Sequence, residues 1–165
     1  MTKKLSSPIR PVDDEARALA RSLIAEARFG ALGVLEPGSG APMVSRVAIG
    51  TGPKGEVVTL ISSLSNHTKA LRENSTASVL LGEPEDKGDP LTHPRITLMC
   101  AARFIEHSDV AYAPMAAHYL ETHPKSKLYI GFGDFVFVVF EVQRAYLNGG
   151  FGKAYELTAR DLGQV

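Results

Sequence analysis

Two short apolar runs, residues 57–61 and 77–81, have the length of buried strands and enclose a polar segment. The segment holds small hydroxyl, amide and basic side chains: Ser62, Ser63, Ser65, Asn66, His67, Thr68 and Lys69. Ser65 or Asn66 can cap a helix over about residues 67–73. Because the first turn of a helix presents unpaired N–H groups and a partial positive charge, this pattern predicts an anion site. The alternative is a capped connecting helix on which Lys69 is a solvated surface lysine.

The strand pattern of residues 42–50 bears on that choice. Its alternation places Arg46 on one face with Val44, Ala48 and Gly50, beside residues that the pattern predicts to be buried. A buried guanidinium needs an anionic or hydrogen-bonding partner. The turn at residues 52–55 is expected to fold this strand against residues 57–61 and to bring Arg46 close to the polar segment.

The rest of the chain predicts strands at short intervals, joined by turns and interrupted by helices, which favours an antiparallel barrel over βαβ units. Beyond a flexible tail at residues 1–11, residues 12–165 are expected to form one domain. We expect one helix over 13–29 and another over 109–121 that is capped by Ser108. Strands are expected over 30–35, 94–106 and 134–142, the last with an extension to 148. A mobile loop is expected over 83–92 and a final helical turn over 158–162. The unbroken apolar run 135–140 predicts a strand covered on both faces, one by the core and one by a second subunit.

Charge and composition narrow the function. The 18 basic and 18 acidic side chains balance, so no overall basic field favours nucleic acid. Cys100 is the one cysteine, which excludes an internal disulfide and a cysteine-built metal site. The five histidines have no metal-ligand spacing, and no nucleophile elbow is present, so we expect chemistry borrowed from a cofactor. Without a signal peptide or a spanning apolar run, a cytoplasmic protein that binds no membrane is expected.

The order of motifs resembles a known family. A strand arginine, a GPKG turn, ISSLS, HTKAL, ASVLL, then RITL, DF and GGFG follow one another over about residues 16–154. This pattern is similar to the pyridoxamine-phosphate-oxidase-like, FMN-binding split barrels, and closest to their haem-utilisation branch. The resemblance implies a mainly β (α+β) fold: a split β-barrel of antiparallel, Greek-key type with peripheral helices.

The resemblance also implies FMN bound at the interface of a homodimer. Arg46 and the pair Thr68 and Lys69 would bind its phosphate, as charge-assisted donors can. Val47, Ile61 and Ser62 would lie along the ring system, with Ser63 and His67 beside the phosphate loop. Lys127 and Tyr129 would come from the partner subunit, and Gly150 would lie near the flavin edge.

Several of these roles have structural alternatives. Arg95 can contact the cofactor or pair with an acidic residue: Glu106, Asp134 or Glu141. Tyr129 can be a packing residue, the loop around Gly150 a tight turn, and His67 an exposed residue at the start of a helix.

The expected function is FMN-dependent redox chemistry that passes electrons to oxygen or a small acceptor. The alternative is a haem- or flavin-binding carrier or sensor without robust turnover. The arginine–histidine signature of true pyridoxamine-phosphate oxidases is absent, because the corresponding region reads NGGFGKAYEL. No histidine follows His123, which argues against haem oxygenation.

Overall fold

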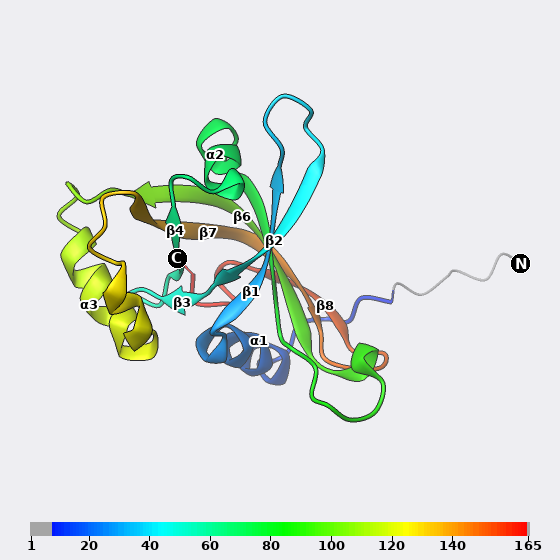
Figure 1. Ribbon diagram of the computed structural model, residues 1–165. Coiled ribbons are helices and arrows are strands. Elements are labelled where there is room, and N and C mark those ends of the chain that lie inside the picture. Colours follow the sequence, from blue (N-terminus) through cyan, green and yellow to red (C-terminus); the bar gives the residue numbers. More distant parts are fainter. Residues whose placement is uncertain (1–7, 165) are drawn as a thin grey trace, which may run out of the picture.

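The protein is one strongly curved antiparallel sheet that curls into a half-barrel, with three α-helices packed on it (Figure 1). The computed structural model describes residues 8–164. Seven strands follow the order β2-β1-β5-β6-β7-β4-β3, and β8 pairs with β7. This architecture confirms the predicted mainly β, antiparallel fold with peripheral helices.

The elements lie close to their predicted positions along the chain. The helices are α1 (Asp14–Glu26), α2 (Asn66–Glu73) and α3 (Tyr112–Thr122), with short 3-10 turns at Pro90–Thr92 and Pro124–Leu128. The strands are β1 (Phe29–Leu35), β2 (Pro42–Ala48), β3 (Gly50–Thr51), β4 (Val57–Ser62), β5 (Thr76–Leu81), β6 (Arg95–Ile105), β7 (Phe135–Asn148) and β8 (Ala154–Thr158).

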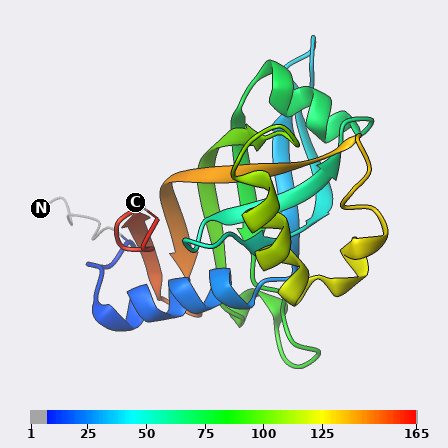
Figure 2. The same ribbon diagram turned by 90° about the vertical axis from the view of Figure 1, so that its left-hand side faces the viewer.

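Strand β7 separates two hydrophobic clusters. Val138 and Phe140 point into the half-barrel, where they join α1 and α2 in the larger core. Phe137 and Val139 point the other way and pack against Tyr119 of α3. The prediction that both faces of this strand are covered is therefore confirmed, but the second cover is α3 of the same chain, not a second subunit. Figure 2 shows α1 (blue) below the strands and α3 (yellow-green) in front of them.

Strand β2 differs from the predicted hairpin. It pairs along its length with β1, and only Gly50–Thr51 of β3 turns back onto β4. Its inward side chains are Met43, Ser45 and Val47, so the alternation has the opposite phase to the predicted one, and Arg46 is exposed. The expectation of a buried Arg46 is wrong because Val47 enters the core and fixes the inward phase of the strand.

Three further differences concern local boundaries. α3 begins at Tyr112 instead of 109, because the Asp109 carboxylate accepts the backbone N–H of Glu106 in a turn before the helix, and Ser108 does not cap it. The C-terminal region contains strand β8 before its turn, and this strand was not predicted. Residues 1–7 of the predicted flexible tail lie outside the described residues, and the backbone N–H of Arg10 donates to the carbonyl of Ala154 at 2.8 Å.

Candidate functional site

The N-terminus of α2 forms as the polar segment predicts. Ser65 is the N-cap residue, and its carbonyl accepts the N–H groups of Thr68 and Lys69 at 3.1 and 3.2 Å. Among residues 8–164, no acceptor bonds the backbone N–H groups of Asn66 and His67. These two donors and the exposed ammonium group of Lys69 make this end of the helix suitable for an anion.

Internal hydrogen bonds use the hydroxyl groups of the same segment. Thr68 is buried, and its Oγ1 donates to the carbonyl of Ser62 at 2.6 Å. Ser62 Oγ donates in turn to Asp134 Oδ2 at 2.8 Å, and the N–H of Ser63 donates to the Asp134 carbonyl at 2.6 Å. Asp134 thus fixes the loop before α2, a role that the sequence did not reveal. Its place directly before the apolar run of β7 was the available signal.

His67 is half-buried instead of exposed. Its Nδ1 lies 3.1 Å from Ser45 Oγ, which links α2 to the inner face of β2. Its Nε2 is buried and has no hydrogen-bond partner among the described residues. Burial lowers the pKa of His67, because removal from water disfavours the charged imidazolium.

The predicted phosphate cradle is not assembled within one chain. Ser45, which contacts His67, and Arg46 point to opposite faces of β2. Arg46 instead lies over the ring of Phe29, with Cζ 5.6 Å from the ring centroid. Of the three residues expected along the flavin ring, Val47 and Ile61 have their side chains in the core, and Ser62 bonds Asp134.

Two predicted residues lie at the far end of β7. Arg95 pairs with Asn148 in the sheet, whereas Ser62 pairs with Phe135 at the opposite end of the same strand. Arg95 Nη1 donates to the carbonyl of Leu91 at 2.8 Å, so this guanidinium holds the loop 83–92 instead of an acidic side chain. The three acidic residues considered as its partners bond elsewhere: Glu106 to Arg72, Glu141 to Arg103 and Asp134 to Ser62.

Gly150 lies in a turn beside this loop, with φ of +122° and its N–H donating to Asn148 Oδ1 at 3.1 Å. The tight-turn interpretation of this segment therefore describes its geometry. In Figure 1, this turn and the loop 83–92 lie at the opposite end of the molecule from α2.

The segment around Tyr129 lies beside the Ser62 end of β7. The rings of Tyr129 and Phe135 are 4.7 Å apart, and the Tyr129 hydroxyl lies 3.0 Å from Ser126 Oγ. Tyr129 is thus a packing residue within its own chain, while Lys127 is exposed.

One face of the sheet carries a row of residues that point away from the larger core. The register runs directly across five strands, and the row comprises Arg46, Ala31, Leu80, Thr97 and Tyr146. The next row comprises Val44, Gly33, Ser78, Met99 and Arg144. Val44 is 69% exposed and Leu80 43%, so no element of the described chain covers this face. We call it the outer face.

Arginines flank aromatic rings on the outer face. Arg144 lies over Tyr146 at 5.9 Å, as Arg46 lies over Phe29. A cavity of about 230 Å³ opens between this face and the loop 83–92, and Phe29, Leu80 and Arg95 contribute to its lining. The face can therefore hold a large apolar ligand that also carries carboxylates.

No described helix has the length and apolar character to span a membrane. Within residues 8–164, no three His, Cys, Asp or Glu side chains gather as a metal-binding group.

The chain resembles known proteins in both sequence and fold. The profile of the CREG beta-barrel family matches residues 11–162. The noncanonical haem oxygenase HOZ of the Arabidopsis thaliana chloroplast is 34% identical over 117 residues, which cover 70% of this chain and 34% of that protein.

Two solved structures show the same fold. A haem-binding protein from Mycobacterium smegmatis superposes with a TM-score of 0.80 at 29% identity, over 94% of this chain and 61% of that one. A Clostridium acetobutylicum protein of the pyridoxinephosphate oxidase family gives a TM-score of 0.69 at 10% identity, over 92% and 99% of the two chains. The predicted resemblance to split barrels with a haem-utilisation branch is confirmed. The chain spans only part of the first two relatives.

Proposed function

Because the chain belongs to the CREG beta-barrel family, we propose that it binds haem and acts in haem utilisation. The observation that carries this proposal is the outer face, where exposed apolar side chains lie in register with arginines. Haem is a large flat apolar ring with two carboxylates, so it needs both kinds of side chain. The haem names of the Arabidopsis and Mycobacterium relatives support the same choice.

Different residues of the outer face would contact different parts of the haem. Phe29, Leu80 and Tyr146 would contact the apolar ring system, and burial of their exposed surface would favour binding. Arg46 is the main candidate to hold a propionate, since its guanidinium is exposed and forms no ion pair within residues 8–164. Bound haem would supply a redox-active iron, while these residues bind and orient it.

A second copy of the chain would complete the site. The outer face is open in one chain, and two copies that face each other across it would enclose the ligand. This arrangement would also bring together residues that lie at opposite ends of β7 in one chain, such as Arg95 and Ser62. We therefore propose a homodimer.

Haemin titration followed by absorbance tests the haem site. The wild-type protein is expected to bind haemin with saturation, and Arg46→Gln to bind it about tenfold more weakly, as loss of one charged hydrogen bond implies. Arg160→Gln is the matched control, because Arg160 is exposed in the C-terminal turn and belongs to neither row of the outer face. Equal affinity in wild type and Arg46→Gln would contradict the assignment of the propionate site.

FMN-dependent redox chemistry is the second candidate, and the N-terminus of α2 is the observation that favours it. The free N–H groups of Asn66 and His67 and the Lys69 ammonium suit a phosphate. FMN titration is expected to show saturable binding that Lys69→Gln weakens about tenfold. Arg46→Gln separates the ligands further, since a phosphate bound at α2 of the same chain would not need Arg46. If the protein binds haemin but not FMN, the FMN proposal is wrong and only the haem proposal remains.

A further inference from the structure

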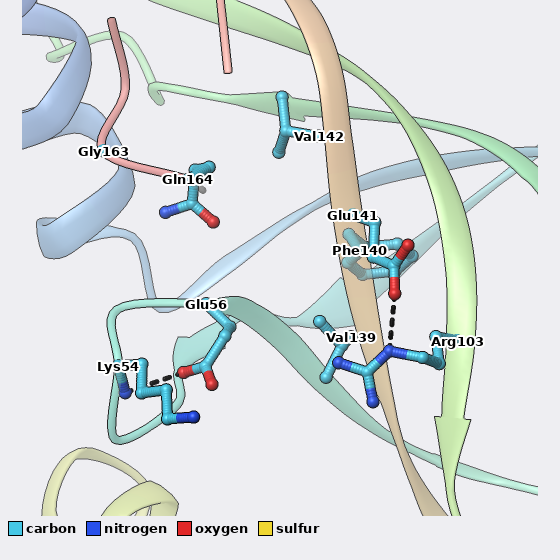
Figure 3. Close-up of a pocket in the computed structure, with 9 residues that line it drawn as sticks. All are labelled: Lys54, Glu56, Arg103, Val139, Phe140, Glu141, Val142, Gly163 and Gln164. Carbon is cyan, nitrogen blue, oxygen red and sulfur yellow. Dashed lines mark hydrogen bonds and ion pairs between the residues drawn. The ribbon is translucent and has the colours of Figure 1, made fainter. Parts of the chain in front are cut away.

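A second cavity shares no lining residue with the rows of the outer face or with α2. It has a volume of about 460 Å³, within the range of small-molecule sites, and four segments distant in sequence line it (Figure 3). These segments are the β3–β4 turn with Lys54 and Glu56, Arg103 of β6, residues 139–142 of β7, and Gly163 and Gln164 after β8. Nothing in the proposed haem site uses these residues.

Hydrogen bonds hold the walls of this cavity in place. Gln164 Nε2 donates to the carbonyl of Gly55 at 2.7 Å, which ties the C-terminal turn to the β3–β4 turn. The N–H of Lys54 donates to Glu56 Oε2 at 2.8 Å, so the Glu56 carboxylate is fixed on its own turn. The cavity is therefore bounded by segments in defined positions.

The charged groups of the cavity keep free bonding capacity toward its interior. Arg103 bonds Glu141 Oε1 through Nε at 2.5 Å, and neither terminal nitrogen of its guanidinium has a partner among the described residues. The ammonium group of Lys54 also has no partner there. One oxygen of Glu56 and one of Glu141 remain as acceptors. In Figure 3, Lys54 and Glu56 face Arg103 and Glu141 across the cavity.

This pattern selects for a particular ligand chemistry. Two cations and two carboxylates balance, so a simple anion or a simple cation would meet repulsion as well as attraction. A ligand with both charges satisfies both sets. Val139 and Val142 supply buried apolar surface at the base of the cavity, against which a short hydrocarbon body can pack.

We propose that this cavity binds a small zwitterion of the amino-acid class. The ligand carboxylate bonds the guanidinium of Arg103 and the ammonium of Lys54. The ligand ammonium bonds the free carboxylate oxygens of Glu56 and Glu141.

Three matched probes test the charge requirement on the intact protein: L-leucine, 4-methylpentanoate, which lacks its amine, and 3-methylbutylamine, which lacks its carboxylate. Backbone amide NMR signals of Gly55, Gly163 and Gln164 report binding at the cavity wall. Leucine is expected to give saturable shifts at these amides, and each half-molecule to bind at least about tenfold more weakly. Absence of saturable shifts with leucine, or equal binding of 4-methylpentanoate, would overturn the proposal.

Two variants assign the contacts. Lys54→Gln removes an ammonium group that makes no contact within the described chain, so the change leaves the fold intact. It is expected to weaken leucine binding about tenfold. Lys125→Gln, at an exposed site outside the cavity, is the control. Glu56→Gln keeps an acceptor for the N–H of Lys54. It is expected to weaken the binding of leucine but not the binding of 4-methylpentanoate. If Lys54→Gln and Glu56→Gln both bind leucine like wild type, the assignment is wrong. Haemin binding by these variants reports separately on the haem site.

Discussion

At the scale of single residues, hydroxyl groups in the loop before α2 build the site by bonding to the protein itself. Thr68 is 1% exposed, and its hydroxyl bonds the Ser62 carbonyl, which also accepts the backbone N–H of Ser65 at 3.1 Å. Loss of the hydroxyl therefore removes one of two bonds to this carbonyl. We expect Thr68→Val to lower the free energy of unfolding by about 0.5–1.5 kcal/mol, measured by urea denaturation. The matched control is Thr76→Val, since Thr76 is exposed on a strand and its hydroxyl has no partner within residues 8–164. An equal effect of both changes would show that the Thr68 bond contributes nothing specific.

Residue-level patterns in the sequence located the polar segment but not the side to which each group points. Helix α2 begins after Ser65 as local rules predict, but the Ser65 side chain makes no capping hydrogen bond within the described chain. The orientation of Arg46 follows from Val47, which enters the core and sets the inward phase of β2, and the alternation alone does not show which phase points inward. The contact between His67 and Ser45 joins residues 22 apart, so no local spacing could have indicated it.

At the scale of elements, the C-terminal turn is attached to α1 through Asp161. Its carboxylate accepts the backbone N–H of Thr158 at 2.9 Å and bonds Arg17 Nε at 2.8 Å. The hydrogen bond from Thr158, followed by that from Arg17, lowers the pKa of Asp161 below its ordinary value. Since the folded state favours the ionised form, this contribution to stability is present above the unfolded pKa of about 4 and is lost as pH falls through the folded pKa.

Asp161→Asn is therefore expected to be less stable than wild type at pH 7, with a difference that narrows below about pH 4. Thermal unfolding of both proteins across this range measures the effect. Asp86→Asn, in the exposed loop 83–92, serves as the control and should show no such narrowing. A gap between wild type and Asp161→Asn that stays constant down to pH 3 would contradict the linkage.

Element prediction succeeded where burial dominates the sequence pattern. Strands β4 and β7 are apolar on both faces because the core and α3 cover them, and unbroken apolar runs are readable without tertiary information. Strand β8 alternates over only five residues, and its place is fixed by pairing with the outer half of β7. The pairing of β8 with β7 cannot be predicted from the five residues of β8 alone.

At the scale of the whole molecule, the outer face is a broad surface of the described sheet that no helix covers, and we propose that two copies pack through it. Val44 lies in its second row, 69% exposed, beside Gly33 of the neighbouring strand. If two copies pack through this face, a carboxylate at position 44 must lose its water without a partner, which is costly. Val44→Asp is therefore expected to convert a dimer, twice the 17.7 kDa chain, into a monomer when mass is measured by light scattering.

The control for this prediction is Val110→Asp, because Val110 is 97% exposed, precedes α3 and lies outside the two rows of the outer face. The same change of charge there should leave the dimer intact. Since the haem site is proposed to need two copies, Val44→Asp should also bind haemin more weakly than Val110→Asp at equal protein concentration. A Val44→Asp protein that remains dimeric would place the interface elsewhere. A monomer that binds haemin as tightly as wild type would show instead that one outer face is sufficient, and the second copy would then have no part in the site.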